Sequence, residues 1–169
     1  MSRARHDQPQ DHRTELLQAF RVDGDDIESN RMGQLGARQR RRLVRSGYLN
    51  LAGATAMAVA LGGIVLAIAE RPLKPVQVIL AGILVVALLI LGIVQLTKAN
   101  AAAADGRIDV HAGPVYVRMR GRAGWYLTVG DQSFKLPVQF WHVQDEAPYR
   151  VYVAPKAGRI MAMEPDGWG

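Results

Sequence analysis

The chain has 169 residues, no cysteine and a formal net charge of +6. The absence of cysteine excludes disulfides, thiolate metal sites and thiol nucleophiles. The basic residues are spread over the N-terminal, middle and C-terminal parts of the sequence. This spread argues against one concentrated nucleic-acid surface, and no nucleic-acid partner is therefore expected.

Two uncharged apolar segments dominate the middle of the chain, from Tyr48 to Ala69 and from Val76 to Thr97. Each has about 22 residues, enough to cross a hydrocarbon core of about 30 Å as a helix. The first follows too long a polar stretch to be a cleavable signal peptide. A soluble domain of this size could not bury two helices that are apolar on all sides. The sequence therefore predicts a two-helix transmembrane hairpin over residues 47–98. The two spans themselves contain no Asp, Glu, Lys, Arg or His, which argues against transport by the hairpin alone.

The distribution of basic residues predicts the topology of this hairpin. Five arginines crowd the positions before the first span, whereas the turn offers only Arg71 and Lys74. By the positive-inside rule, both chain ends face the cytoplasm. The same charges could also bind anionic lipid headgroups. Such binding would accompany their role in topology and not replace it. The arginines are Arg38, Arg40, Arg41, Arg42 and Arg45.

Small residues in the first span predict close helix packing. Ala54, Ala58 and Gly62 recur at four-residue spacing, and small side chains let helix backbones approach each other. The second span, another copy of the chain and a larger membrane protein are all candidate contacts. Asn50 and Gln95 are expected at similar depth near the cytoplasmic surface, either hydrogen-bonded together or each facing interfacial water.

The N-terminal segment, residues 1–46, is predicted to contain short helices. Residues 1–12 are polar without periodicity and are expected to be disordered. A short helix capped by Thr14 follows, and Asp25 with Glu28 fits a capping box that opens a second one. The acidic residues here lack the glycine and glutamate that an EF-hand loop needs, so no metal site is predicted.

Two short motifs flank the hairpin. Residues 30–39 fit the pattern NRxGxLxxxQ, and residues 149–155 fit YRVYxxP. This order of motif, basic helix, hairpin and C-terminal strand resembles a family of bacterial two-span membrane proteins without an assigned activity. The resemblance implies the architecture and a bacterial plasma (inner) membrane, and it carries over no functional residues.

After Asp105-Gly106 the apolar period changes from helical to two, which indicates strands. Turn residues such as Gly113-Pro114 and Gly130-Asp131 separate the runs. The pattern predicts five to seven short strands in an antiparallel sheet or partly closed barrel over residues 105–169. Its core is expected to hold Trp125, Phe134, Phe140 and several valines, and residues 138–146 either close the barrel or form a partner surface. The predicted fold is thus a membrane α-helical hairpin plus a small C-terminal antiparallel β domain.

No catalytic, cofactor-binding or metal site is predicted in this β domain. His111 and His142 have no carboxylate at ligand spacing, and no nucleophile elbow surrounds Ser133. One strand face could contact acidic headgroups or an acidic partner, with an ordinary solvated face as the alternative. That face presents Tyr116, Arg118 and Arg120.

These features favour a non-enzymatic integral membrane protein, an accessory or scaffolding subunit that holds a small cytosolic β domain at the membrane. Its expected partners are membrane lipids and either a larger membrane protein or a second copy. The alternative is a membrane-anchored sensor that binds a small ligand or a lipid headgroup through the β domain. A pocket lined by Tyr116, Trp125 and Trp141 would favour the sensor.

Overall fold

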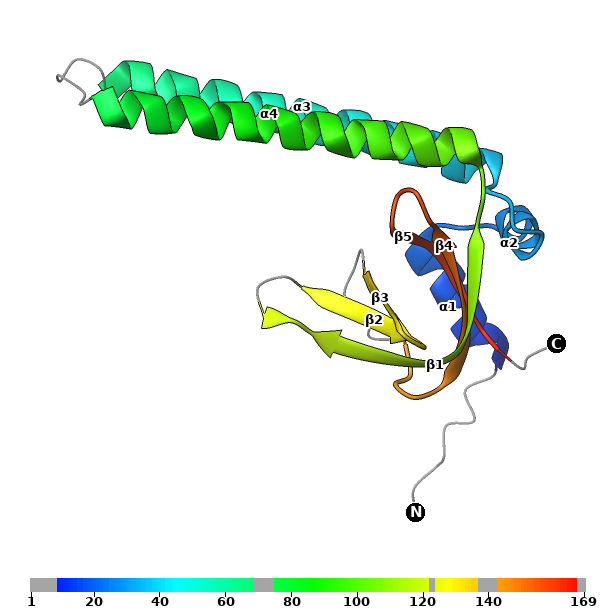
Figure 1. Cartoon of the computed structure of the whole chain (residues 1–169). Helices are drawn as coiled ribbons and strands as arrows, with labels where there is room; N and C mark the ends of the chain where they lie inside the picture. Colours follow the sequence, from blue (N-terminus) through cyan, green and yellow to red (C-terminus); the bar gives the residue numbers. More distant parts are fainter. Residues whose placement is uncertain (1–8, 69–74, 122–123, 137–142, 167–169) are drawn as a thin grey trace. The chain divides into compact units, whose positions relative to one another are not determined.

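A computed structural model describes residues 9–68, 75–121, 124–136 and 143–166. The chain divides into two compact units, residues 41–104 and residues 1–40 together with 105–169. Figure 1 labels the elements along the chain. They are α1 (Pro9–Phe20), α2 (Gly24–Arg31), α3 (Ala37–Ile68), α4 (Pro75–Asp105), β1 (Asp109–Met119), β2 (Trp125–Val129), β3 (Gln132–Lys135), β4 (Pro148–Ala154) and β5 (Arg159–Pro165).

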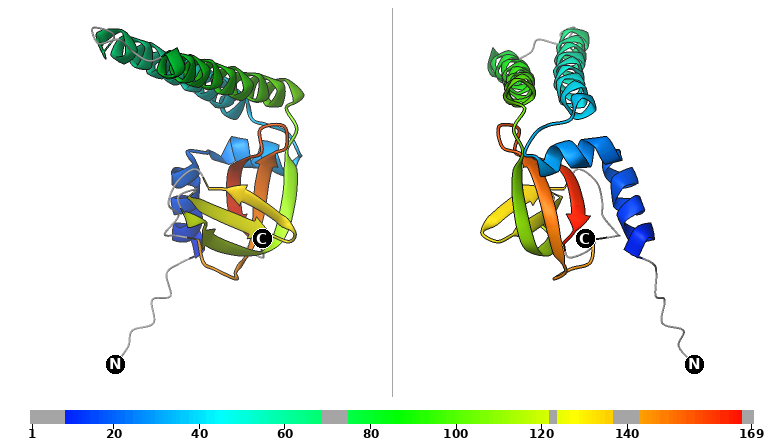
Figure 2. Two further views of the ribbon diagram at one scale, coloured as in Figure 1. Left: turned by 60° about the vertical axis from the view of Figure 1, so that its left-hand side comes forward. Right: turned by 90° about the vertical axis from the view of Figure 1, so that its right-hand side faces the viewer.

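The helical unit confirms the predicted pair of long apolar helices. Residues 37–65 of α3 and residues 76–105 of α4 are long and apolar enough to span a membrane. Only 6% of the most apolar stretch of each helix is buried. The two helices run side by side in Figures 1 and 2. Apolar helices this exposed need a nonpolar environment, which a bilayer supplies.

A seam of small residues joins the two helices. A β-carbon built on Gly47 would lie 3.0 Å from the Ala99 β-carbon, and one built on Gly92 would lie 3.0 Å from the Ala54 β-carbon. Each helix therefore contributes a glycine, a leucine four residues later and an alanine three residues after that. Seven-residue spacing of this kind is typical of coiled-coil packing. The seam consists of Gly47, Leu51 and Ala54 on α3 and Gly92, Leu96 and Ala99 on α4.

The predicted packing ladder only partly coincides with this seam. Ala54 lies against Gly92, and Ala58 is buried, but a β-carbon on Gly62 would meet nothing within 4 Å. Each four-residue step turns about 40° around a helix, so a ladder at that spacing rotates away from a straight partner. Asn50 and Gln95 are both exposed, and no hydrogen bond joins them in the part of the chain that the structure describes.

The N-terminal helices begin earlier than predicted. α1 starts at Pro9, so Thr14 lies inside the helix and residues 9–12 are helical; residues 1–8 fall outside the described part. The cap of α2 is Asp23, and the prediction of Asp25 is wrong. Asp23 has an extended backbone, and its carboxylate accepts a hydrogen bond from the Asp26 amide at 3.0 Å. That geometry is the one an N-cap requires.

The β strands form one antiparallel sheet in the order β3-β2-β1-β4-β5. β1 continues through Gly113-Pro114, which was wrongly predicted to be a turn. Residues 109–114 of β1 pair with β4, and residues 115–119 pair with β2. Pro114 thus lies where β1 changes partners, a position at which a missing amide donor is tolerated.

The sheet curls, which brings its two edge strands, β3 and β5, into contact. The resulting circular order, β1-β2-β3-β5-β4, occurs in five-stranded, partly open Greek-key barrels such as the OB-fold. Such a topology is shared by proteins of many functions and does not assign one. Figure 2 shows the long, bent β1 running through both halves of the sheet.

The two halves of the sheet differ in how they are covered. In β4 and β5, residues 151–154 and 160–164 are all buried, and α1 packs against β5. In β1 to β3, more buried positions alternate with less buried ones: Leu127 and Val129 of β2 are buried and Tyr126 and Thr128 between them half-buried, so one face is core and the other is more open. The inner face centres on Val115, Leu127 and Val151, whereas Trp125 and Phe134 are only half-buried. Phe140 lies outside the described residues.

Candidate functional site

The segments that lead into α3 and out of α4 are hydrogen-bonded to each other. The Leu35 amide donates to the Gly106 carbonyl at 2.8 Å, and the Ile108 amide donates to the Gly33 carbonyl at 2.9 Å. Gly33 and Gly106 have φ angles of +75° and +63°, which glycine adopts without strain. We call this region the joint: residues 30–40 and 106–108 with Tyr152 and Glu164.

The start of α3 is fitted closely into the joint. The Gln39 side chain accepts a hydrogen bond from the Gly36 amide at 3.2 Å, the reach-back half of a capping box. A β-carbon on Gly36 would overlap the Asp26 carboxylate, and one on Gly106 would overlap the Arg40 guanidinium. A side chain at either position would displace the facing carboxylate or guanidinium, and Gly106 also has a positive φ that other residues rarely adopt.

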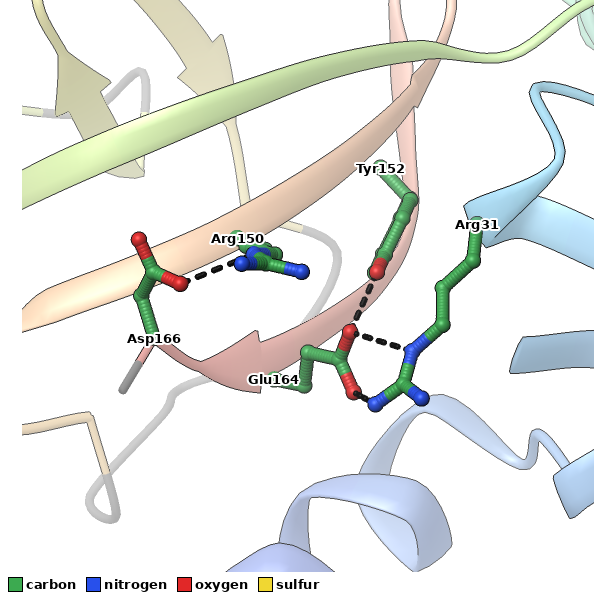
Figure 3. A network of polar contacts seen from close by, with 5 residues as sticks. All are labelled: Arg31, Arg150, Tyr152, Glu164 and Asp166. Atoms are coloured by element: carbon green, nitrogen blue, oxygen red, sulfur yellow. Dashed lines mark hydrogen bonds and ion pairs between the residues drawn. The ribbon is translucent and has the colours of Figure 1, made fainter. Parts of the chain in front are cut away.

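An ion pair joins Arg31, the last residue of α2, to Glu164 of β5, as Figure 3 shows. The Arg31 Nε donates to Glu164 Oε1 at 3.0 Å, and its terminal nitrogen donates to Oε2 at 2.6 Å. The Tyr152 hydroxyl donates to the same Oε1. The Glu164 side chain is 4% exposed, whereas the Arg31 side chain is 50% exposed. Such a bidentate pair fixes geometry as well as adding energy.

The pKa shifts follow from this arrangement. Burial raises the pKa of Glu164, but the hydrogen bonds from Arg31 and Tyr152 outweigh it, and the net pKa lies below the ordinary value. Burial, followed by the bond to Glu164, raises the pKa of Tyr152 to about 12. The pKa of Arg31 is raised by its bond to Glu164. The triad thus holds one negative and one positive charge at neutral pH.

The joint brings together the two motifs found in the sequence. Arg31 comes from the first motif and Tyr152 from the second, and Glu164 of β5 links them. The sequence gives no signal for Glu164, because an acidic residue near the chain end has no distinctive spacing. The motifs themselves were the signal for the joint, although their contact could not be deduced from them.

The second motif makes further contacts within the same unit. The Tyr149 hydroxyl accepts from the Gln144 amide at 3.1 Å and lies 3.0 Å from the His12 ring nitrogen. The Arg150 Nε donates to Asp166 at 2.8 Å (Figure 3). These contacts tie α1 and the end of β5 to β4, so the N-terminal segment belongs to the β unit.

The five arginines predicted to mark topology lie at the start of α3 and differ in their contacts. Arg38 pairs with Asp23, and the Arg40 Nε donates to the Leu35 carbonyl at 3.2 Å. Arg41 and Arg45 are exposed. Arg42 is also exposed and makes a contact of its own. Two of the five therefore contribute to the joint.

The predicted partner surface lies on the open side of β1 to β3. Antiparallel pairing places Tyr116 opposite Thr128 and Arg118 opposite Tyr126, and partners across a ladder share a face. Tyr126 in turn lies opposite Lys135. We call this surface the basic face: Tyr116, Arg118, Arg120, Tyr126, Thr128, Ser133 and Lys135.

The residues proposed to line a sensor pocket do not share one face. Trp125 pairs with Met119, three residues from Tyr116 along β1, so Trp125 and Tyr116 lie on opposite sides of the sheet. Trp141 and His142 are outside the described residues. His111 packs on Phe134 with ring centroids 5.4 Å apart. The described residues include no cluster of three or more side chains suited to a metal ion.

Comparisons with known proteins add no assignment. No protein-family model matches the chain, and no curated protein or solved structure matches it. The candidate sites therefore rest on their own geometry.

Proposed function

We propose that the chain is a non-enzymatic membrane adaptor of the bacterial plasma membrane, in which a two-span anchor holds a small cytoplasmic β domain for a membrane partner. The observation that supports this most strongly is the joint. A protein that only needed localisation could be attached by a flexible linker. Here α3 begins at Ala37, directly after residues that are hydrogen-bonded to the chain leaving α4.

The construction of the β unit from both sides of the hairpin also favours an adaptor. Residues 1–40 and 105–169 fold together, so the domain is complete only when the hairpin returns the chain to its starting side. This supports a topology with both ends on one side. The arginines before the first span favour the cytoplasm for that side.

Partner capture tests the proposal. The tagged full-length protein is purified from native membranes in mild detergent, and the bound proteins are identified by mass spectrometry. A membrane protein in stoichiometric amount is expected. The matched variants are Glu164→Gln, which loosens the joint, and Arg150→Gln, which breaks the pair with Asp166 elsewhere in the same unit. The first should weaken capture and the second should not; recovery of the wild-type protein alone would contradict the adaptor.

Topology needs a separate experiment. Reporter fusions at residue 73 and at the C-terminus should place the turn outside and the tail inside. The reverse result would contradict the cytoplasmic β domain and leave the fold unchanged.

A further inference from the structure

The basic face carries positive charge and hydroxyl groups and no carboxylate. From Tyr116 to the end of β3, the described side chains on this side, with Arg120 directly after β1, are two arginines, a lysine, two tyrosines, a threonine and a serine. Thr128 and Ser133 are joined by a hydrogen bond of 2.8 Å between their hydroxyls. Cations with hydroxyl donors beside them are suited to phosphate oxygens.

The cations of this face are not neutralised within the described part of the chain. Other basic residues of the unit pair with aspartates: Arg107 with Asp109 and Lys156 with Asp105. No ion pair joins Arg118, Arg120 or Lys135 to a carboxylate among the described residues. Asp145, beside β1, accepts a hydrogen bond from the Val117 amide at 3.0 Å. The positive charge is therefore available to an external anion.

One of these cations is already held in place. The Arg120 guanidinium carbon lies 5.1 Å from the centre of the Tyr126 ring, a cation–π contact. Tyr126 and Tyr116 add two aromatic rings to the same face as the arginines. Tyrosines beside basic residues are typical of surfaces that meet the headgroup region of a bilayer.

We propose that the basic face docks on anionic phospholipid headgroups of the membrane that anchors the hairpin. α4 ends at Asp105, and residues 106–108 of the joint follow at once, so the chain passes from the membrane helix into the β unit without a long linker. Such a short tether gives a high effective concentration, so a weak electrostatic surface is sufficient. A soluble acidic protein would have no such advantage. The inference rests on the membrane insertion in the proposed function and requires no protein partner.

Two adjacent labelling sites test this docking. The chain has no cysteine, so Ser133→Cys introduces a single thiol on the basic face and Gln132→Cys one on the opposite face of β3. Each full-length variant carries a fluorophore and is placed in nanodiscs of phosphatidylcholine, with or without phosphatidylglycerol. Headgroup-attached spin labels serve as quenchers. Quenching at position 133 should rise with phosphatidylglycerol and disappear at about 1 M salt, where the Debye length is about 3 Å. Position 132 should respond much less.

A charge-matched pair of variants tests which cations act. Arg118→Gln with Arg120→Gln removes two charges from the face, and Arg150→Gln with Lys156→Gln removes two elsewhere in the unit. The first should lower the ratio of docked to free protein about 25-fold, at roughly fivefold for each residue, and the second should leave it nearly unchanged. An unaltered tryptophan emission spectrum shows that each variant is folded.

Three results would overturn the docking proposal. The first is quenching that ignores phosphatidylglycerol, and the second is an equal loss in both double variants. The third is a thiol at position 133 that is shielded from a water-soluble thiol reagent in native membranes but not in anionic nanodiscs. That result would assign the face to an acidic protein. Each is independent of partner capture, so the adaptor and the docking surface can fail separately.

Discussion

At the scale of single residues, Glu164 is the contact on which the joint depends most. Its carboxylate accepts from both Arg31 and Tyr152 and is almost fully buried. Glu164→Gln is expected to lower the free energy of unfolding of the β unit by about 2 kcal/mol, because charge-assisted hydrogen bonds are lost at a buried site. All three tryptophans, at positions 125, 141 and 168, follow the hairpin, so their fluorescence in a denaturant titration measures this unit. Arg150→Gln, which breaks a more exposed pair, should cost less than about 1 kcal/mol.

The same residue should make stability depend on acidity. The pKa of Glu164 in the folded state lies below its ordinary value of 4.5, because the bonds from Arg31 and Tyr152 outweigh burial. A carboxyl group with a lowered folded pKa adds stability above the unfolded pKa and loses it as the pH falls through the folded pKa. The stability difference between wild type and Glu164→Gln should therefore be constant above about pH 5 and shrink in more acidic solution. Denaturant titrations at several pH values measure it; a gap that widened in acid would contradict the ion pair.

At the scale of elements, the helix seam is the feature most sensitive to side-chain size. Gly92→Leu should separate α3 from α4 by about 2 Å, since helix axes lie about 8 to 10 Å apart according to the side chains between them. Spin labels at the exposed positions 50 and 95 would report the change. Gly82→Leu is the matched control on α4, because a β-carbon there would meet nothing within 4 Å. Equal distances in both variants would show that Gly92 does not set the spacing.

The elements also show how far the sequence could predict this molecule. The apolar segments predicted both long helices, because exclusion of charge over about 22 residues has few other physical causes. Gly113-Pro114 was misassigned because a proline that ends a strand and one at a change of partner look alike in sequence. The helix seam could not be predicted from the sequence, because Ala54 belongs both to the four-residue ladder with Ala58 and to the seven-residue pattern with Gly47. The joint depends on contacts between residues far apart in the sequence, such as Leu35 with Gly106 and Arg31 with Glu164, which local spacing cannot reveal.

At the scale of the whole molecule, the hairpin interrupts a domain that is built from both of its flanks. If residues 41–104 are replaced by a short Gly-Ser linker, the remaining chain should fold as a water-soluble protein. The reason is that residues 1–40 and 105–169 already form one compact unit, with Leu35 bonded to Gly106 across the junction. Residues 105–169 alone should not fold, because the covered sides of β4 and β5 would lose α1 and Glu164 would lose Arg31. Tryptophan emission and near-ultraviolet circular dichroism distinguish the two chains. Equal stability of the two chains would mean that the N-terminal segment is not needed for folding and that the joint does not stabilise the domain. A folded linker protein together with an unfolded fragment would show that the joint is part of the domain's core.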